Sequence, residues 1–100
     1  MAEIVLVHGL WNRGWSMAAM AKRLRSRGHD VLVFSYPTRG DSLDGHADAL
    51  HAFILKKMAA ERGNRELHLV GHSLGGLVTL NMFARHQDLP PGRVVLMGTP

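Results

Sequence analysis

The strongest constraint on the fold is the alternation of short apolar runs with longer stretches of helical spacing. Runs rich in β-branched and aliphatic residues predict strands at residues 3–8, 30–36, 66–71 and 93–98. The stretches between them predict helices at residues 15–27, 43–62 and from 74 onward. Strands that alternate with helices favour a parallel sheet, because parallel neighbours need a crossover that a helix supplies. We therefore expect an α/β fold.

The apolar pattern within these segments predicts how the layers pack. The first helix has apolar residues spaced by three and four positions, namely Met17, Met20, Ala21 and Leu24. The second has a similar stripe, made of Leu43, Ala47, Leu50, Ile54 and Met58. The third is apolar around much of its circumference, so we expect it to be largely buried. The first and fourth strands are almost continuously apolar, which is typical of parallel strands with helices on both faces.

The order of the strands decides where a functional site can lie. We expect a four-stranded parallel sheet in the order 2-1-3-4, with the three helices on its two faces. The first and third strands are then neighbours at the point where the strand order reverses. Open α/β sheets bind ligands at this point, beyond the carboxyl ends of the strands. The segments after these two strands are therefore the first places to search for chemistry.

The segment after the third strand is Gly-His-Ser-Leu-Gly, with Ser73 at its centre. The pattern Gly-x-Ser-x-Gly between a strand and a helix is typical of a sharp turn that exposes a nucleophilic serine. Gly71 and Gly75 avoid collisions in such a turn, and Gly76 lets the helix lie close to the sheet. The helix N-terminus favours negative charge beside Ser73. An ordinary glycine-rich turn is the alternative for a five-residue motif taken alone.

The segment after the first strand carries a second signal, the sequence His8-Gly9-Leu10-Trp11. A strand that leads into His-Gly-apolar is where a serine hydrolase places its second oxyanion donor. We expect the backbone N–H groups of Leu10 and Leu74 to form an oxyanion hole. His8, Gly9 and Trp11 are candidate pocket residues; core packing is the alternative for Trp11, and a hydrogen bond that holds the loop is the favoured role for His8.

These segments together resemble the α/β-hydrolase family, in particular its lipase and esterase branch. The matching segments occur in the family's order and at comparable spacing, at Val5–Trp11, Leu69–Leu77 and Val95–Pro100. The resemblance covers essentially the whole chain, so we expect residues 1–100 to be the N-terminal part of a hydrolase domain. It implies hydrolysis of a small-molecule carboxylic ester without a cofactor, with Ser73 as the nucleophile.

The rest of the catalytic triad is not evident. In the family, an acid and then a histidine follow the nucleophile, but after Ser73 the chain has only His86 and Asp88 of these types. Both follow the third helix, roughly 18–20 Å from Ser73 at ~1.5 Å per residue. We therefore expect neither to serve Ser73 and expect the enzyme to be incomplete in this chain. A non-catalytic binding or interaction module with the same fold is the alternative.

Other classes of site find no support in the sequence. The chain has no cysteine, which excludes thiolate metal sites. No pair of its histidines and acidic residues has a metal-ligand spacing such as His-x-x-x-His on a helix with a Glu between, so we expect no metal. We expect His46 and His51 at the surface of the second helix. Neither Gly-x-Gly-x-x-Gly nor a phosphate-binding loop pattern occurs, which argues against nucleotide binding.

Charge and hydropathy indicate the partners and the location. The net charge of +4 is mild, and we expect no nucleic-acid partner. The apolar runs are far shorter than the ~20 residues of a membrane span, and no secretory signal is visible, so we expect a cytoplasmic protein. The fourth strand would be an exposed edge, which predicts marginal stability or self-association.

Overall fold

The computed structural model describes residues 3–8, 17–36, 42–59, 66–89 and 92–97 of the chain. Its strands are β1 (Glu3–Val7), β2 (Asp30–Phe34), β3 (Leu67–His72) and β4 (Val94–Met97). Its helices are α1 (Ala18–Ser26), α2 (Leu43–Ala59) and α3 (Leu74–Arg85). The strands and helices therefore alternate along the chain in the predicted order.

The sheet has the predicted topology. Its four strands are parallel and lie in the order β2-β1-β3-β4. In this register Val7, at the end of β1, lies opposite Phe34 of β2 and Gly71 of β3. The segments that follow β1 and β3 therefore leave the same edge of the sheet from neighbouring strands.

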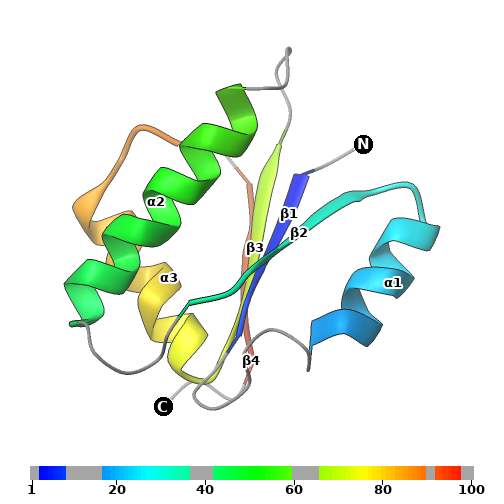
Figure 1. Ribbon diagram of the computed structural model, residues 1–100, viewed down its shortest axis with the longest axis horizontal. Coiled ribbons are helices and arrows are strands. Elements are labelled where there is room, and N and C mark those ends of the chain that lie inside the picture. The colour runs from blue at the N-terminus through cyan, green and yellow to red at the C-terminus, as the bar shows by residue number, and fades with distance from the viewer. Residues whose placement is uncertain (1–2, 9–16, 37–41, 60–65, 90–91, 98–100) are drawn as a thin grey trace.

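Helices cover both faces of the sheet, as the apolar strands predict. The side chains of β1 alternate between the two layers: Val5 and Val7 join the core with α2 and α3, whereas Ile4 and Leu6 pack with α1. Figure 1 shows α2 and α3 on one side of the sheet and α1 on the other. The central strand is therefore buried on both sides, which explains its continuous apolar sequence.

The expectation that helices also cover both faces of the fourth strand is wrong for the described residues. Val94, Val95 and Leu96 are 38%, 50% and 40% exposed. Val95 lies opposite Val70 on the face of the sheet that α1 covers, and a helix about 10 Å wide covers about two strands spaced ~4.8 Å apart. Val94 and Leu96 lie on the other face, at the end of the strand order. Leu80 of α3 is also exposed, so the third helix is less buried than its composition predicts.

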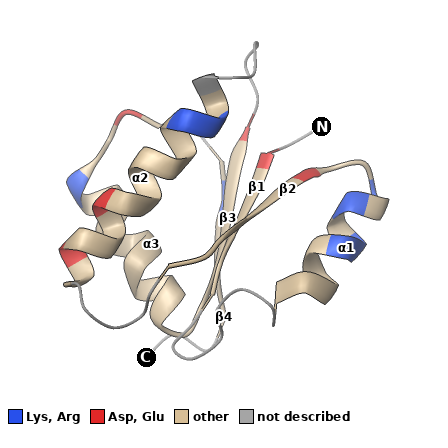
Figure 2. Cartoon of the chain, in the orientation of Figure 1, with Lys and Arg blue, Asp and Glu red and all other residues tan. Residues whose placement is uncertain are grey.

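The charged residues of the helices follow the helix dipoles (Figure 2). Arg23 and Arg25 lie in the last turn of α1, and Lys56 and Lys57 in the last turn of α2. Asp44 lies in the first turn of α2. These positions place cations at the negative ends of the helices and an anion at a positive end. None of the helices described here has both the length and the apolarity needed to cross a membrane.

We predict that two leucines of α2 contribute very differently to the free energy of unfolding. Leu50 is fully buried between the sheet and α3, whereas Leu55 is 41% exposed. Leu50→Ala should lower the free energy of unfolding by about 2–5 kcal/mol, because it removes buried apolar surface and leaves a cavity. Leu55→Ala should change it by about 0.5 kcal/mol or less. Urea unfolding followed by circular dichroism measures both, and equal losses would contradict this packing.

Candidate active site

Ser73 lies in a strained turn between β3 and α3. It is the N-cap residue of α3, with φ 55° and ψ −121°, a conformation that residues with a β-carbon rarely adopt. Two backbone hydrogen bonds hold it there: the Ser73 N–H donates to the Met97 carbonyl at 2.9 Å, and the Gly76 N–H donates to the Ser73 carbonyl at 2.9 Å. The turn is therefore fixed by β4 on one side and by the start of α3 on the other.

The glycines of the motif allow this turn to pack against the end of β1. A Cβ atom at Gly75 would lie 2.2 Å from the Val7 carbonyl oxygen and 2.5 Å from that of His8. A Cβ atom at Gly71 would lie 2.7 Å from the Cα of Gly76. No side chain fits at these separations, so the first turn of α3 can touch β1 only through glycine.

The end of β1 is held to the end of β2 by His8 and Tyr36. The His8 ring is fully buried and stacks on the Tyr36 ring, with centroids 4.4 Å apart. The Tyr36 N–H donates to His8 Nε2 at 3.2 Å, and the Tyr36 hydroxyl donates to the His8 carbonyl at 2.8 Å. Burial raises the pKa of Tyr36 to about 12, so this hydroxyl remains a donor at neutral pH. His8 Nε2 therefore accepts a hydrogen bond from the backbone N–H of Tyr36.

The structure describes one of the two candidate oxyanion donors, Leu74, but not the other, Leu10. Leu74 is the first residue of α3, and an N–H at this position has no carbonyl partner within its own helix. Its role as an oxyanion donor at the Ser73 turn stays a prediction. Leu10, with its neighbours Gly9 and Trp11, lies outside the described residues, so the second donor and the pocket stay predictions.

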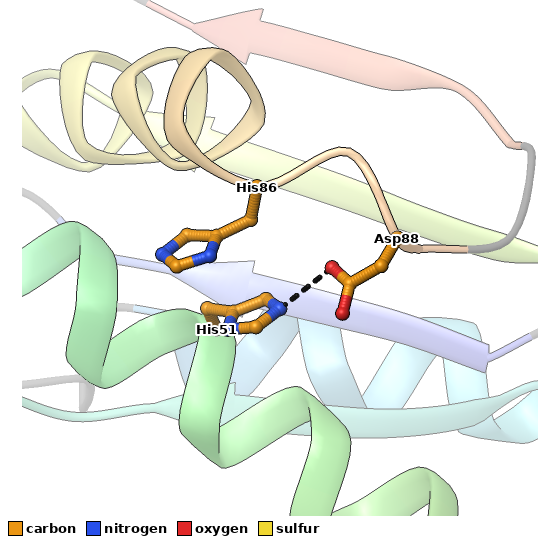
Figure 3. A group of neighbouring side chains, drawn as sticks. All are labelled: His51, His86 and Asp88. Atoms are coloured by element: carbon orange, nitrogen blue, oxygen red, sulfur yellow. Dashed lines mark hydrogen bonds and ion pairs between the residues drawn. The ribbon is translucent and has the colours of Figure 1, made fainter.

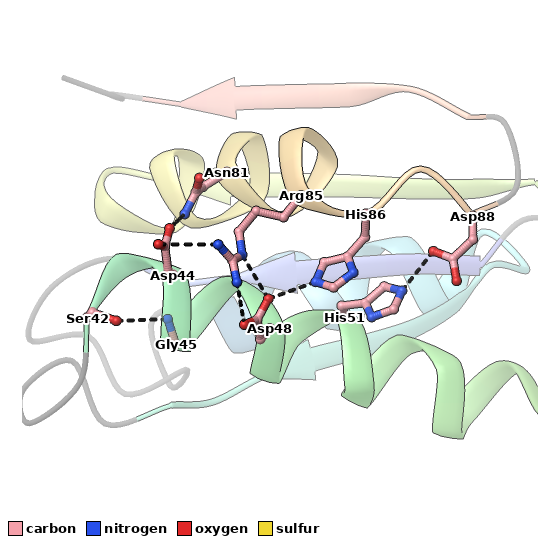
Figure 4. Close-up of polar contacts among 9 residues, drawn as sticks. All are labelled: Ser42, Asp44, Gly45, Asp48, His51, Asn81, Arg85, His86 and Asp88. Carbon is pink, nitrogen blue, oxygen red and sulfur yellow. Dashed lines mark hydrogen bonds and ion pairs between the residues drawn. The ribbon is translucent and has the colours of Figure 1, made fainter.

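His86 and Asp88 lie at the opposite end of α3 from Ser73. The helix α3, which separates Ser73 from these two residues, has 12 residues and is therefore ~18 Å long at ~1.5 Å per residue. Both contact α2 instead: His86 Nε2 lies 2.7 Å from Asp48 Oδ1, and Asp88 Oδ1 lies 2.8 Å from His51 Nε2 (Figure 4). Their contacts therefore belong to the packing of the two helices rather than to the serine turn.

The expectation that His46 and His51 lie at the surface is wrong for His46, whereas His51 is partly buried. His46 is 4% exposed, because it lies on the face of α2 that packs on Tyr36, with ring centroids 4.8 Å apart. His51 faces α3 and stacks on His86, with ring centroids 3.7 Å apart and an interplanar angle of 6°. The helical pattern shows which positions are apolar but not that these imidazoles also face inward.

One group among the described residues has the donor types and the proximity of metal ligands. His51, His86 and Asp88 each offer a ligand atom, and these atoms lie within 4.8 Å of one another (Figure 3). Sequence reasoning missed this group, because His51 and Asp88 are 37 positions apart and no local spacing connects them. The group can be recognised only from the packing of α2 against α3, which brings the three side chains together.

Comparison with known proteins adds a family and several relatives. A model of the alpha/beta hydrolase family matches residues 4–100. A carbendazim hydrolyzing esterase of Nocardioides is 37% identical over 82 residues, which cover 78% of this chain and 34% of the relative. The pimeloyl-[acyl-carrier protein] methyl ester esterase of Vibrio cholerae is 33% identical over 103 residues, covering 98% of this chain and 37% of the relative.

A solved structure shares the fold. The pyrethroid hydrolase of Sphingobium faniae superposes with a TM-score of 0.69 at 26% identity, over 98% of this chain and 40% of that one. The chain thus spans well under half the length of each of these relatives.

We predict that the strain at Ser73 can be measured through stability. Ser73→Gly should be more stable than Ser73→Ala by about 1 kcal/mol, since glycine relieves a strain of order 1–3 kcal/mol and costs about 0.5–1 kcal/mol in chain entropy. Ser26 in the last turn of α1 is the matched control. There the order should reverse, with glycine less stable than alanine. Thermal unfolding of the four variants tests this, and the same order at both sites would contradict a strained turn.

Proposed function

Because the chain belongs to the alpha/beta hydrolase family, we propose that it hydrolyses carboxylic esters with Ser73 as its nucleophile. The observation that carries the proposal is the positive φ of Ser73 at the start of α3, in a turn that packs on β1 through Gly75. A turn that holds a serine in a strained conformation at a helix N-terminus is costly for a purely structural role. It is useful where the hydroxyl must reach a substrate.

The reaction follows from this position. The Ser73 oxygen attacks the ester carbonyl carbon, a base takes the serine proton and passes it to the departing alcohol, and water then cleaves the acyl-serine by the same route. The backbone N–H groups of Leu74 and Leu10 are the proposed donors to the oxyanion. The positive end of the α3 dipole favours the same negative charge.

We propose that the base is none of His8, His51 and His86. His8 Nε2 accepts the Tyr36 N–H, and the rings of His51 and His86 pack against each other with carboxylate partners. Residues 1–100 would then supply the nucleophile and the oxyanion hole as the N-terminal part of a hydrolase domain. The acid and the histidine would come from further chain.

The proposed substrate is a small-molecule carboxylic ester. Two of the relatives named above are esterases, and one of them is named for a methyl ester. Gly9 and Trp11 are the proposed lining of an apolar pocket beside the oxyanion hole, and His8, which contacts Tyr36, precedes them at the end of β1. The expected cytoplasmic location stays a prediction.

Activity on an aryl acetate tests the nucleophile. The 100-residue chain should hydrolyse p-nitrophenyl acetate slowly, far below the ~10 s⁻¹ of a typical enzyme, because a site without its base keeps the oxyanion donors and little else. Ser73→Ala should reduce this rate to the background of the buffer. Ser26→Ala, the same change in α1, should leave the rate unchanged.

The alternatives give different results in the same assay. A slow rate that survives Ser73→Ala in a protein with an unchanged circular dichroism spectrum would reject the nucleophile and favour a binding module. A rate near ~10 s⁻¹ would mean that a base is present in the chain. Substitution of each histidine in turn would then identify that base.

We also propose that the chain self-associates through β4. Among the described residues β4 pairs with β3 alone, and its Val94, Val95 and Leu96 are exposed. An apolar strand with a free edge favours pairing with another strand. A second copy of the chain offers the same surface, so a symmetric dimer is the simplest product.

Sedimentation velocity tests this association. The average sedimentation coefficient should rise with concentration, and Val95→Lys should shift the protein toward monomer because it places a charge on the exposed strand. Ala84→Lys, a similar change at an exposed site on α3, is the control and should have no such effect. A concentration-independent monomer would contradict the proposal.

A further inference from the structure

Two helices bring together three side chains that are far apart in the sequence. His51 lies in α2, whereas His86 and Asp88 follow the end of α3. Figure 3 shows the two imidazole rings packed against each other, with the Asp88 carboxylate beside His51. We name this group the His–His–Asp cluster.

We propose that the His–His–Asp cluster binds a first-row divalent transition-metal ion such as Zn²⁺. Two imidazole nitrogens and one carboxylate oxygen are ligands that Zn²⁺, Co²⁺ and Ni²⁺ accept, whereas Mg²⁺ and Ca²⁺ prefer oxygen alone. Ligands at about 2.1 Å on a tetrahedral ion lie about 3.4 Å from one another. The three ligand atoms here lie within 4.8 Å of one another, so a rearrangement of the side chains can bring them to this spacing.

Asp48 prepares His86 for this role. The Arg85 guanidinium donates to both Asp48 oxygens, at 2.9 and 2.8 Å, and forms an ion pair with this carboxylate, whose Oδ1 also lies 2.7 Å from His86 Nε2. An ionised carboxylate only accepts hydrogen bonds, so His86 Nε2 must donate to it. The ring then carries its proton on Nε2 and keeps the Nδ1 lone pair for an ion. A carboxylate behind a histidine is the usual support of a metal ligand.

The direction of the free nitrogen agrees with this arrangement. In Figure 4 the second ring nitrogen of His86 lies on the side of His51 and Asp88, away from Asp48. Asp88 is exposed, with 60% of its side chain accessible, so solvent can reach the ion and complete its coordination. Three protein ligands with one position open to water is a common zinc arrangement.

Metal binding must change the ring stack. An ion lies close to the plane of each imidazole that binds it, and the two rings are nearly parallel, at 6° and 3.7 Å between centroids. One ring must therefore turn about its Cβ–Cγ bond before both nitrogens reach one ion. The stack and the His51–Asp88 hydrogen bond would be replaced by three metal bonds, which gives the test a spectroscopic signature.

The position of the cluster sets its role. It lies at the C-terminal end of α3, whereas Ser73 lies at the N-terminal end, 12 helical residues away. An ion there would not touch the ester. It would join α2 to the segment after α3 and stabilise the packing of these helices, since a ligand that binds only the folded state raises its stability.

Isothermal titration calorimetry of the chain without a histidine tag tests the site. Zn²⁺ should bind with a stoichiometry of one and a Kd in the micromolar range, and Mg²⁺ should not bind. His51→Gln and His86→Gln should each weaken Zn²⁺ binding at least tenfold. Asp48→Asn, which removes the support but no ligand, should weaken it about 10–100-fold.

His68→Gln is the matched control. His68 also pairs with a carboxylate, Glu66 Oε2 at 3.0 Å, but it lies on β3, outside the cluster. It should leave Zn²⁺ affinity unchanged. Equal affinities in wild type, His51→Gln and His86→Gln would overturn the proposal, as would an equal loss in His68→Gln.

A measurement on the wild-type chain keeps the test independent of how the variants fold. Saturating Zn²⁺ should move the NMR resonances of the His51 and His86 rings, leave those of His68 in place, and raise the melting temperature. Unmoved His51 and His86 resonances at saturating Zn²⁺ would overturn the proposal even if some Zn²⁺ binds elsewhere.

Discussion

At Gly75 the first turn of α3 passes so close to the end of β1 that an added Cβ atom would lie 2.2 Å from the Val7 carbonyl oxygen. This contact exists because the strand order makes β1 and β3 neighbours. It forces the chain to turn sharply at Ser73, and the positive φ of that residue is the local cost. A closely packed crossover and a strained serine are therefore two consequences of one geometric requirement.

The two ends of α3 are held in different ways. At its start, backbone atoms and glycines meet, so no side chain can adjust the fit. At its end, side chains do the holding, because Arg85 and His86 both bind Asp48 of α2. Backbone contacts fix one geometry, whereas side chains can exchange partners. A rigid turn suits a nucleophile, and the adjustable end is where an ion could replace a hydrogen bond.

How far each feature can be predicted from the sequence depends on how local its cause is. The strands, the helices and the glycine turn depend on patterns within a few residues, and the structure confirms them together with the expected strand order. The burial of His46 and the partial burial of His51 were not predicted, because they depend on which face of α2 meets Tyr36 and His86. The exposed edge of β4 was predicted, but the exposure of its side chains was not, because an apolar run indicates burial without saying what provides it.

The same distinction separates the proposed nucleophile from the general base that it needs. The turn that holds Ser73, the proposed nucleophile, is formed by six consecutive residues, from Gly71 to Gly76, and is held by backbone atoms at the ends of β1 and β4. A general base needs an imidazole brought from a distant element with a free nitrogen at the serine. Here His8 has its Nε2 occupied by the Tyr36 N–H, and His86 is bound by Asp48 at the far end of α3. Local sequence can thus encode the strained serine, whereas a base depends on packing between distant segments.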